Sequence, residues 1–150
     1  MYRTILVAID GSEYSDKAAR HAAALAKMLG SKRVLFHVAP PTGLLPYSEA
    51  LDIGPFDKAN EEVRRARDSW AQELLAHTRE NLGMPELAVE EVFAVSSHPY
   101  EVILETAKTR NCDLIVIAPH GSHYAIGGVL LGSEIQKVLT HAKRPVLVVR

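Results

Sequence analysis

The sequence predicts an α/β protein: a doubly wound, five-stranded parallel sheet of strand order 3-2-1-4-5 with helices on both faces. Short apolar runs alternate along the chain with longer segments of helical periodicity, a pattern typical of parallel sheets. The runs 4–9 and 113–118 are apolar almost throughout, as in strands buried on both faces. Right-handed crossovers then leave few strand orders, and 3-2-1-4-5 is the one we expect.

Composition narrows the class of protein. A chain of 150 residues that is 47% hydrophobic can form one domain over residues 1–150 without disulfides, and Cys112 has no second cysteine to pair with. The net charge of -1 argues against nucleic acid as a partner. No apolar stretch approaches the ~18 residues of a membrane span, and the N-terminus lacks a signal-peptide pattern. We therefore expect a cytoplasmic protein with no membrane contact.

The first elements follow from local signals. The strand 4–9 is broken at Asp10 and Gly11, and Ser12 can cap the helix that follows. Gly30 ends that helix, and residues 34–38 form the second strand. Residues 40–56 are rich in proline and glycine yet apolar, so this segment is either a binding loop or lid, or a packed surface connection.

The second half repeats the alternation. A long helix is predicted over 57–82, with its apolar stripe at Val63, Ala66, Trp70 and Leu74. Residues 87–95 alternate apolar and acidic side chains, as in a strand near a sheet edge. The remaining predicted elements are a helix opened by Pro99, the strand 113–118, a helix from Ser133 and the strand 145–149.

The strand order places a candidate site where the chain reverses direction, between the first and fourth strands. Ligands of such folds bind beyond the carboxyl ends of the strands, so the site should combine residues 8–11 with those from Ala118 onward. Residues 118–133 are rich in glycine and end at a helix start. This segment is either a phosphate-binding loop or a glycine-rich turn with Ser133 as N-cap.

The chain resembles the universal stress protein family over almost its whole length. The matching pieces are residues 5–12 (ILVAIDGS), 35–38 (LFHV), 112–117 (CDLIVI), 120–121 (HG), 131–133 (LGS) and 144–149 (RPVLVV). The resemblance implies the same sheet order, in the adenine nucleotide alpha hydrolase-like fold, and a stress-response regulator as function. It also implies a homodimer through the last strand, at Val146, Leu147, Val148 and Val149.

The apolar last strand supports the dimer independently, since an exposed edge of this kind pairs with other chains. The alternative is an edge covered by the segment 40–56. The sequence does not identify a regulatory protein partner.

The ATP-binding members of this family carry glycine, two residues, glycine, nine residues, then glycine and Ser or Thr. In this chain Ala118 replaces the first glycine and Gly121 matches the second. Gly132 and Ser133 match the last pair, but ten residues separate them from Gly121, one more than in the motif. The pair Gly127 and Gly128 could absorb the extra residue as a bulge. These departures favour an alternative function, a nucleotide-free dimeric interaction module.

The resemblance implies ATP as ligand, or AMP or a cyclic nucleotide, together with Mg²⁺ or Mn²⁺. The nucleotide-binding residues it implies are Ala8, Ile9, Asp10, Val38, Ile117, Ala118, His120, Gly121, Gly132, Ser133 and Glu134. Asp10 would bind the ribose or Mg²⁺; its alternative role is to cap the first helix. The charge of Glu134 would repel phosphate unless the side chain points away or joins a metal.

The remaining polar residues give little indication of a metal site or a catalytic site. His120 and His123 form a pair too small for a structural zinc site, and His37 and Cys112 are interpreted as structural. No catalytic motif is present, so at most weak ATP hydrolysis is expected. A response-regulator receiver domain would need an acidic pair after the first strand and a phosphorylatable Asp after the third, and residues 96–99 (SSHP) offer none.

Overall fold

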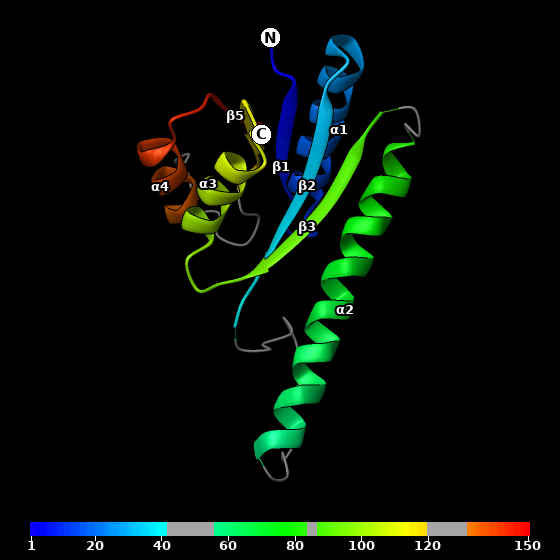
Figure 1. The fold of residues 1–150 in the computed structure, drawn as a ribbon, viewed down its shortest axis with the longest axis vertical. Helices are drawn as coiled ribbons and strands as arrows, with labels where there is room; N and C mark the ends of the chain where they lie inside the picture. Colours follow the sequence, from blue (N-terminus) through cyan, green and yellow to red (C-terminus); the bar gives the residue numbers. More distant parts are fainter. Residues whose placement is uncertain (42–55, 84–86, 120–131) are drawn as a thin grey trace.

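A computed structural model describes residues 1–41, 56–83, 87–119 and 132–150. These residues form a five-stranded parallel sheet of order β3-β2-β1-β4-β5 flanked by helices (Figure 1), which confirms the predicted order. The elements are β1 (Thr4–Ala8), α1 (Glu13–Leu29), β2 (Lys32–Ala39), α2 (Phe56–Leu82), β3 (Val89–Val95), α3 (Pro99–Thr109), β4 (Leu114–Ile117), α4 (Ser133–His141) and β5 (Val146–Val148).

Strand β1 is the centre of the sheet. Val7 pairs with Leu35 of β2 on one side and with Val116 of β4 on the other. The side chains of Ile5, Leu6 and Val7 are fully buried, which explains the unbroken apolar run. Because the connections after β1 and β4 leave the sheet at neighbouring carboxyl ends, the predicted ligand position lies between them.

Two apolar cores lie on opposite faces of the sheet, since successive strand side chains point to opposite sides. One face packs on α1 and α2, through residues such as Val7, Ala22 and Leu75. The other packs on α3 and α4, through residues such as Phe36, Ile103 and Val138. Figure 1 shows α3 and α4 side by side, away from α1 and α2.

The predicted ends of α1 are confirmed. Ser12 is the N-cap, and its hydroxyl oxygen accepts a hydrogen bond from the Ser15 amide at 3.1 Å. Gly30 ends the helix in the left-handed conformation, with φ +65°, and its N–H donates to the Ala26 carbonyl. Both signals are local, which is why the sequence was sufficient to predict them.

The predicted apolar stripe of α2 is confirmed only in part, at Leu74, which is half-buried and packs on the core. The helix buries Ala71, Leu75 and Thr78, whereas Trp70 is 40% exposed and Ala66 is exposed as well. The reason lies in the docking of the helix: its first half runs beyond the end of the sheet (Figure 1), so only its second half meets the sheet. Most of the predicted loop or lid at 40–56, residues 42–55, lies outside the described residues.

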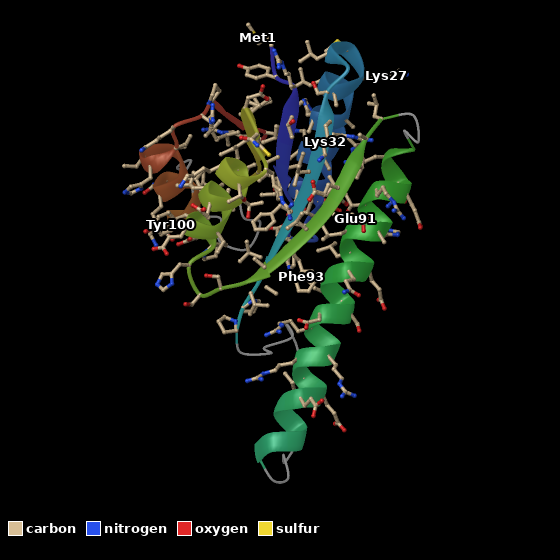
Figure 2. The ribbon with its side chains drawn as sticks, in the orientation of Figure 1. Met1, Lys27, Lys32, Glu91, Phe93 and Tyr100 are labelled. Atoms are coloured by element: carbon tan, nitrogen blue, oxygen red, sulfur yellow. The ribbon has the colours of Figure 1, made fainter. Side chains whose placement is uncertain are left out.

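The sheet has β3 and β5 at its edges. The edge position of β3 was predicted from its acidic residues; Glu90 pairs with Lys32 and Glu91 pairs with Arg79. In Figure 2 Phe93 lies on the side of β3 that faces α2, where it packs on the core. Within the described residues, none of the helices combines the length and apolarity needed to cross a membrane.

Candidate functional site

The carboxyl edge of the sheet carries a small apolar surface. Ala8, Val38 and Ile117, at the ends of three neighbouring strands, all belong to the core cluster on the α3 and α4 face. Ile117 is buried, while Ala8 and Val38 remain half-buried. Small apolar side chains at neighbouring strand ends form a surface suited to a flat, apolar ring.

Ala118, the residue that replaces a motif glycine, lies on the opposite face. Its side chain is half-buried and packs against the core cluster of the α1 and α2 face. The alternation of side chains along a strand explains this, because Ile117 already points to the α3 and α4 face. The methyl group of Ala118 therefore does not belong to the apolar surface of Ala8 and Val38.

Asp10 begins the turn between β1 and α1. Its Oδ1 atom accepts hydrogen bonds from the backbone N–H of Ser12 at 2.9 Å and from the Ser12 hydroxyl at 2.6 Å. Gly11 between them has φ +83°, a conformation that favours glycine. Asp10 thus supports the N-cap of α1 through Ser12, so its predicted capping role is present in the structure.

The peptide before Asp10 is held by β2. The Ile9 N–H donates to the Phe36 carbonyl at 2.8 Å, and the His37 Nδ1 atom lies 2.8 Å from the Ile9 carbonyl oxygen. His37 is 5% exposed, and its ring meets Trp70 edge-on at a centroid distance of 5.2 Å. The sequence predicted that His37 is structural, but no spacing signal indicated its contact with Ile9.

The start of α4 supplies the second half of the site. Its N-cap is Gly132, with no side-chain capping hydrogen bond, and Ser133 is the first helical residue. The predicted alternative of Ser133 as N-cap is therefore wrong, because the chain enters the helix one residue earlier. The first N–H groups of a helix have no partner within it and carry the positive end of its dipole, so they favour an anion.

Glu134 lies in the first turn of α4, and two partners hold its carboxylate. One carboxylate oxygen accepts from the Tyr100 backbone N–H at 3.0 Å, and the other accepts from Lys137 Nζ at 2.7 Å. Tyr100 is at the N-terminus of α3 (Figure 2), where the N-cap His98 makes no capping bond of its own. Glu134 therefore caps the N-terminus of α3.

The ionisation of Glu134 follows from these contacts. Partial burial raises the pKa of the carboxyl group, but the hydrogen bonds from Lys137 and the Tyr100 amide outweigh it, so the net pKa is lowered. At neutral pH Glu134 is a carboxylate whose charge faces α3 and Lys137. Lys137 also lies 5.3 Å from the centre of the Tyr100 ring.

Other predicted residues fall into two groups. His120, His123 and Gly121 lie outside the described residues, as does the rest of the glycine loop up to Leu131. Cys112 is buried, and burial raises the pKa of its thiol to about 11, as expected for an inert structural cysteine. Among the residues that the structure describes, no three His, Cys, Asp or Glu side chains gather as a metal site.

The buried His37 predicts a pH-dependent stability. Burial lowers the pKa of the ring below its ordinary value of 6.5, more than the Ile9 carbonyl and Asp10 raise it. As the pH falls below 6.5, the unfolded chain binds a proton that the folded protein does not, so the free energy of unfolding decreases. The decrease ends once the pH is below the pKa of the folded state.

This dependence can be measured by urea denaturation of the wild type and of His37→Asn between about pH 7 and pH 5.5. Asparagine does not titrate, so the stability difference between the two proteins should change across this range. The fluorescence of Trp70, the one tryptophan of the chain, gives the unfolding signal. A difference that stays constant with pH would contradict the prediction.

Comparisons with known proteins agree with this geometry. The model of the universal stress protein family matches residues 1–150. A Thermus aquaticus relative, the universal stress protein in the QAH/OAS sulfhydrylase 3' region, is 34% identical to this chain over 150 residues. The match covers 100% of each of the two chains.

Solved structures show the same fold. The structure of protein MJ0577, from Methanocaldococcus jannaschii, matches with a TM-score of 0.78 and 25% identity, over 99% of this chain and 96% of that one. A universal stress protein in complex with cAMP matches with a TM-score of 0.69 and 25% identity, over 99% of this chain and 97% of that one.

Proposed function

This chain belongs to the universal stress protein family, and we propose that it is a stress-response regulator that binds an adenine nucleotide at the carboxyl edge of β1 and β4. The observation that carries the proposal is the apolar surface of Ala8, Val38 and Ile117. This surface shares its core cluster with Ile135 in the first turn of α4. A surface for a base and a helix N-terminus for phosphates therefore lie on one packed unit.

In this proposal the adenine ring lies on Val38 and borders the buried Ile117, and the ribose meets Asp10 and the backbone of Ala8 and Ile9. Ring stacking on small aliphatic side chains needs a partly open surface, and Val38 is half-buried. Neighbouring strands hold these backbones, since Ala8 pairs with Phe36. The structure of a universal stress protein in complex with cAMP supports the proposal that the ligand is an adenine nucleotide.

The phosphates would be bound at the start of α4 by the amides of Gly132, Ser133 and Glu134. The Glu134 carboxylate does not obstruct this role, because it caps α3 and pairs with Lys137. His120, Gly121 and the backbone at Ala118 complete the proposed site. ATP, AMP and a cyclic nucleotide all offer the same adenine and phosphate chemistry to these residues.

A divalent ion would enter with the nucleotide. Asp10 offers a carboxylate, the ligand type that Mg²⁺ prefers, and Mg²⁺ commonly takes one or two carboxylates together with substrate phosphates. The described residues hold no group of three or more His, Cys, Asp or Glu side chains that could bind a metal. We therefore propose that Asp10 binds Mg²⁺ or Mn²⁺ that arrives with the nucleotide. We propose binding as the function, with hydrolysis weak at most.

Calorimetric titration with ATP–Mg²⁺, AMP and cAMP tests the proposal, with GTP as a control for the base. We expect heat of binding for at least one adenine nucleotide and a rise in melting temperature with its concentration. The absence of both effects for every adenine nucleotide would contradict it. That result would favour the alternative suggested by Ala118, a nucleotide-free dimeric interaction module.

We also propose a homodimer in which the β5 edge pairs with its copy. The carbonyl of Pro145 accepts from Ile115, and the N–H of Val149 donates to Ile117. Residues alternate in a ladder, so the N–H groups of Val146 and Val148 face the open edge. The side chains contribute less than predicted: Val149 is 6% exposed and packs in the core, so the pairing would rest on the backbone.

Replacing Val148 by proline should weaken the dimer, because proline removes the N–H that faces the open edge and leaves the hydrogen bonds between β4 and β5 in place. The change also removes a side chain that packs on the core, so thermal denaturation must show that the variant is folded. Val95→Pro is the matched control. Its N–H faces away from β2 at the other edge, since the neighbouring Ser96 N–H donates to Ala39. Sedimentation velocity should show Val148→Pro as a monomer at concentrations where the wild type and Val95→Pro are dimers. Equal sedimentation of all three would contradict the β5 interface.

A further inference from the structure

His37 and Val38 serve opposite faces of the sheet at the same strand end. Val38 packs on the α3 and α4 face, in the proposed adenine surface. His37 points to the other face, where its ring contacts Trp70 of α2. The imidazole is 5% exposed, so it lies behind the site and cannot itself touch a bound nucleotide.

The hydrogen bond of His37 defines its tautomer. Its Nδ1 atom lies 2.8 Å from the Ile9 carbonyl oxygen, and a carbonyl only accepts, so Nδ1 carries the proton. The Nε2 atom is buried and has no hydrogen-bond partner among the described residues. A buried nitrogen without a partner is costly, so this arrangement persists because the Nδ1 contact and the packing of the ring compensate.

The contact acts on the peptide that introduces Asp10. The Ile9 carbonyl and the Asp10 N–H belong to one planar peptide group. The N–H of Ile9 donates to the Phe36 carbonyl at 2.8 Å, and the Ile9 carbonyl accepts from His37. Two neighbouring residues of β2 therefore bind the N–H and the carbonyl of Ile9, and the His37 bond restrains the rotation of the peptide plane that leads into Asp10.

Helix α2 holds the ring and the following turn together. The ring of Trp70 meets that of His37 at an interplanar angle of 69°. At Gly11, a Cβ atom would lie 3.6 Å from both Trp70 Cζ2 and Leu74 Cδ1, so α2 also packs against the turn after Asp10. His37, Trp70 and Gly11 thus form one packed unit behind the Asp10 carboxylate.

We propose that His37 is a positioning residue of the nucleotide site: its Nδ1–H holds the Ile9 carbonyl and so sets the orientation of Asp10. The inference rests on the proposed function, since it assigns a role in adenine nucleotide binding. Its physical content is independent of any ligand, because the orientation of the Asp10 peptide is a property of the protein alone.

The test compares His37→Asn with His37→Leu, whose side chains have the same branched shape. The amide nitrogen of asparagine stands where Nδ1 stands in histidine, so His37→Asn retains the donor and His37→Leu removes it. Calorimetry with ATP–Mg²⁺, AMP and cAMP should give a Kd about tenfold higher for His37→Leu than for His37→Asn, the scale of one hydrogen bond. Equal Kd values in the two variants would overturn the positioning role.

A ligand-free measurement separates this inference from the proposed function. Nitrogen-15 NMR of the wild-type imidazole should show a protonated Nδ1 and an unprotonated Nε2. The backbone amide signals of residues 10–12 should shift in His37→Leu and stay near their wild-type positions in His37→Asn. The opposite tautomer, or equal shifts in both variants, would overturn the inference.

The two measurements distinguish the possible failures. If the wild type binds no adenine nucleotide but its NMR signals are as expected, the proposed function is contradicted. The contact by which His37 orients Asp10 is then still supported. A wild type that binds, with NMR signals that contradict the expected tautomer, overturns the inference alone. Where His37→Leu does not fold, a wild-type imidazole with a protonated Nε2 in place of Nδ1 would still overturn the inference.

Discussion

Replacing Ala8 by tryptophan is expected to weaken adenine nucleotide binding by at least about 100-fold, equal to about 2.7 kcal/mol. Ala8 is half-buried at the end of β1 and packs on the same cluster as Val38 and Ile117. An indole at this position would fill the surface on which the adenine ring is proposed to lie. Calorimetric titration of the variant with the nucleotide that binds the wild type measures the loss.

A matched control separates occlusion from general damage. Leu139 of α4 is 41% exposed, so Leu139→Trp adds the same ring away from the strand ends and should bind as the wild type does. Thermal denaturation of both variants shows whether Ala8→Trp is folded. If folded Ala8→Trp binds with wild-type affinity, the nucleotide does not lie on this surface.

The largest expected effect on stability comes from Phe36→Ala, which should lower the free energy of unfolding by about 3–5 kcal/mol. Phe36 is 1% exposed and lies in the core cluster under α3 and α4. The loss combines the transfer free energy of the ring with the cavity that remains. A domain is stable by only about 5–15 kcal/mol, so the variant should unfold at much lower denaturant concentration.

Phe93→Ala provides the comparison, because it removes the same ring from an edge strand. Phe93 of β3 is half-buried against the other core cluster, so its ring loses less contact and leaves a smaller cavity. Urea denaturation of both variants should therefore show the greater loss for Phe36→Ala. Equal losses would mean that burial in the central strands does not decide stability in this sheet.

Much of the fold was predictable because its signals are local. The strand β1 is apolar on both faces, since it is buried on both faces, and the pattern is visible without a structure. Ser12 and Gly30 act through their own backbone geometry, so their positions predicted the ends of α1. The order of strands followed from the handedness of the crossovers, which the same alternation of elements implies.

The candidate site was predictable in its location but not in its contacts. The switch between β1 and β4 placed Ala8, Ile117 and Asp10 near one another, as parallel strands require. The sequence could not show that Ala118 packs on the face opposite to Ala8. That distinction depends on the phase of strand alternation relative to the two layers of helices.

The sequence by itself determined the alternation of elements and the ends of α1, because those properties depend on residues close to each other in the chain. The sheet order pairs residues as distant as Val7 and Val116, and it was predicted from the right-handed crossovers and the family resemblance. Only the tertiary structure decided which face of α2 is buried, which helix Glu134 caps and which carbonyl His37 holds. These contacts join residues from separate elements. Their partners depend on how each helix is rotated and docked on the sheet, and residue spacing along the chain does not encode that rotation.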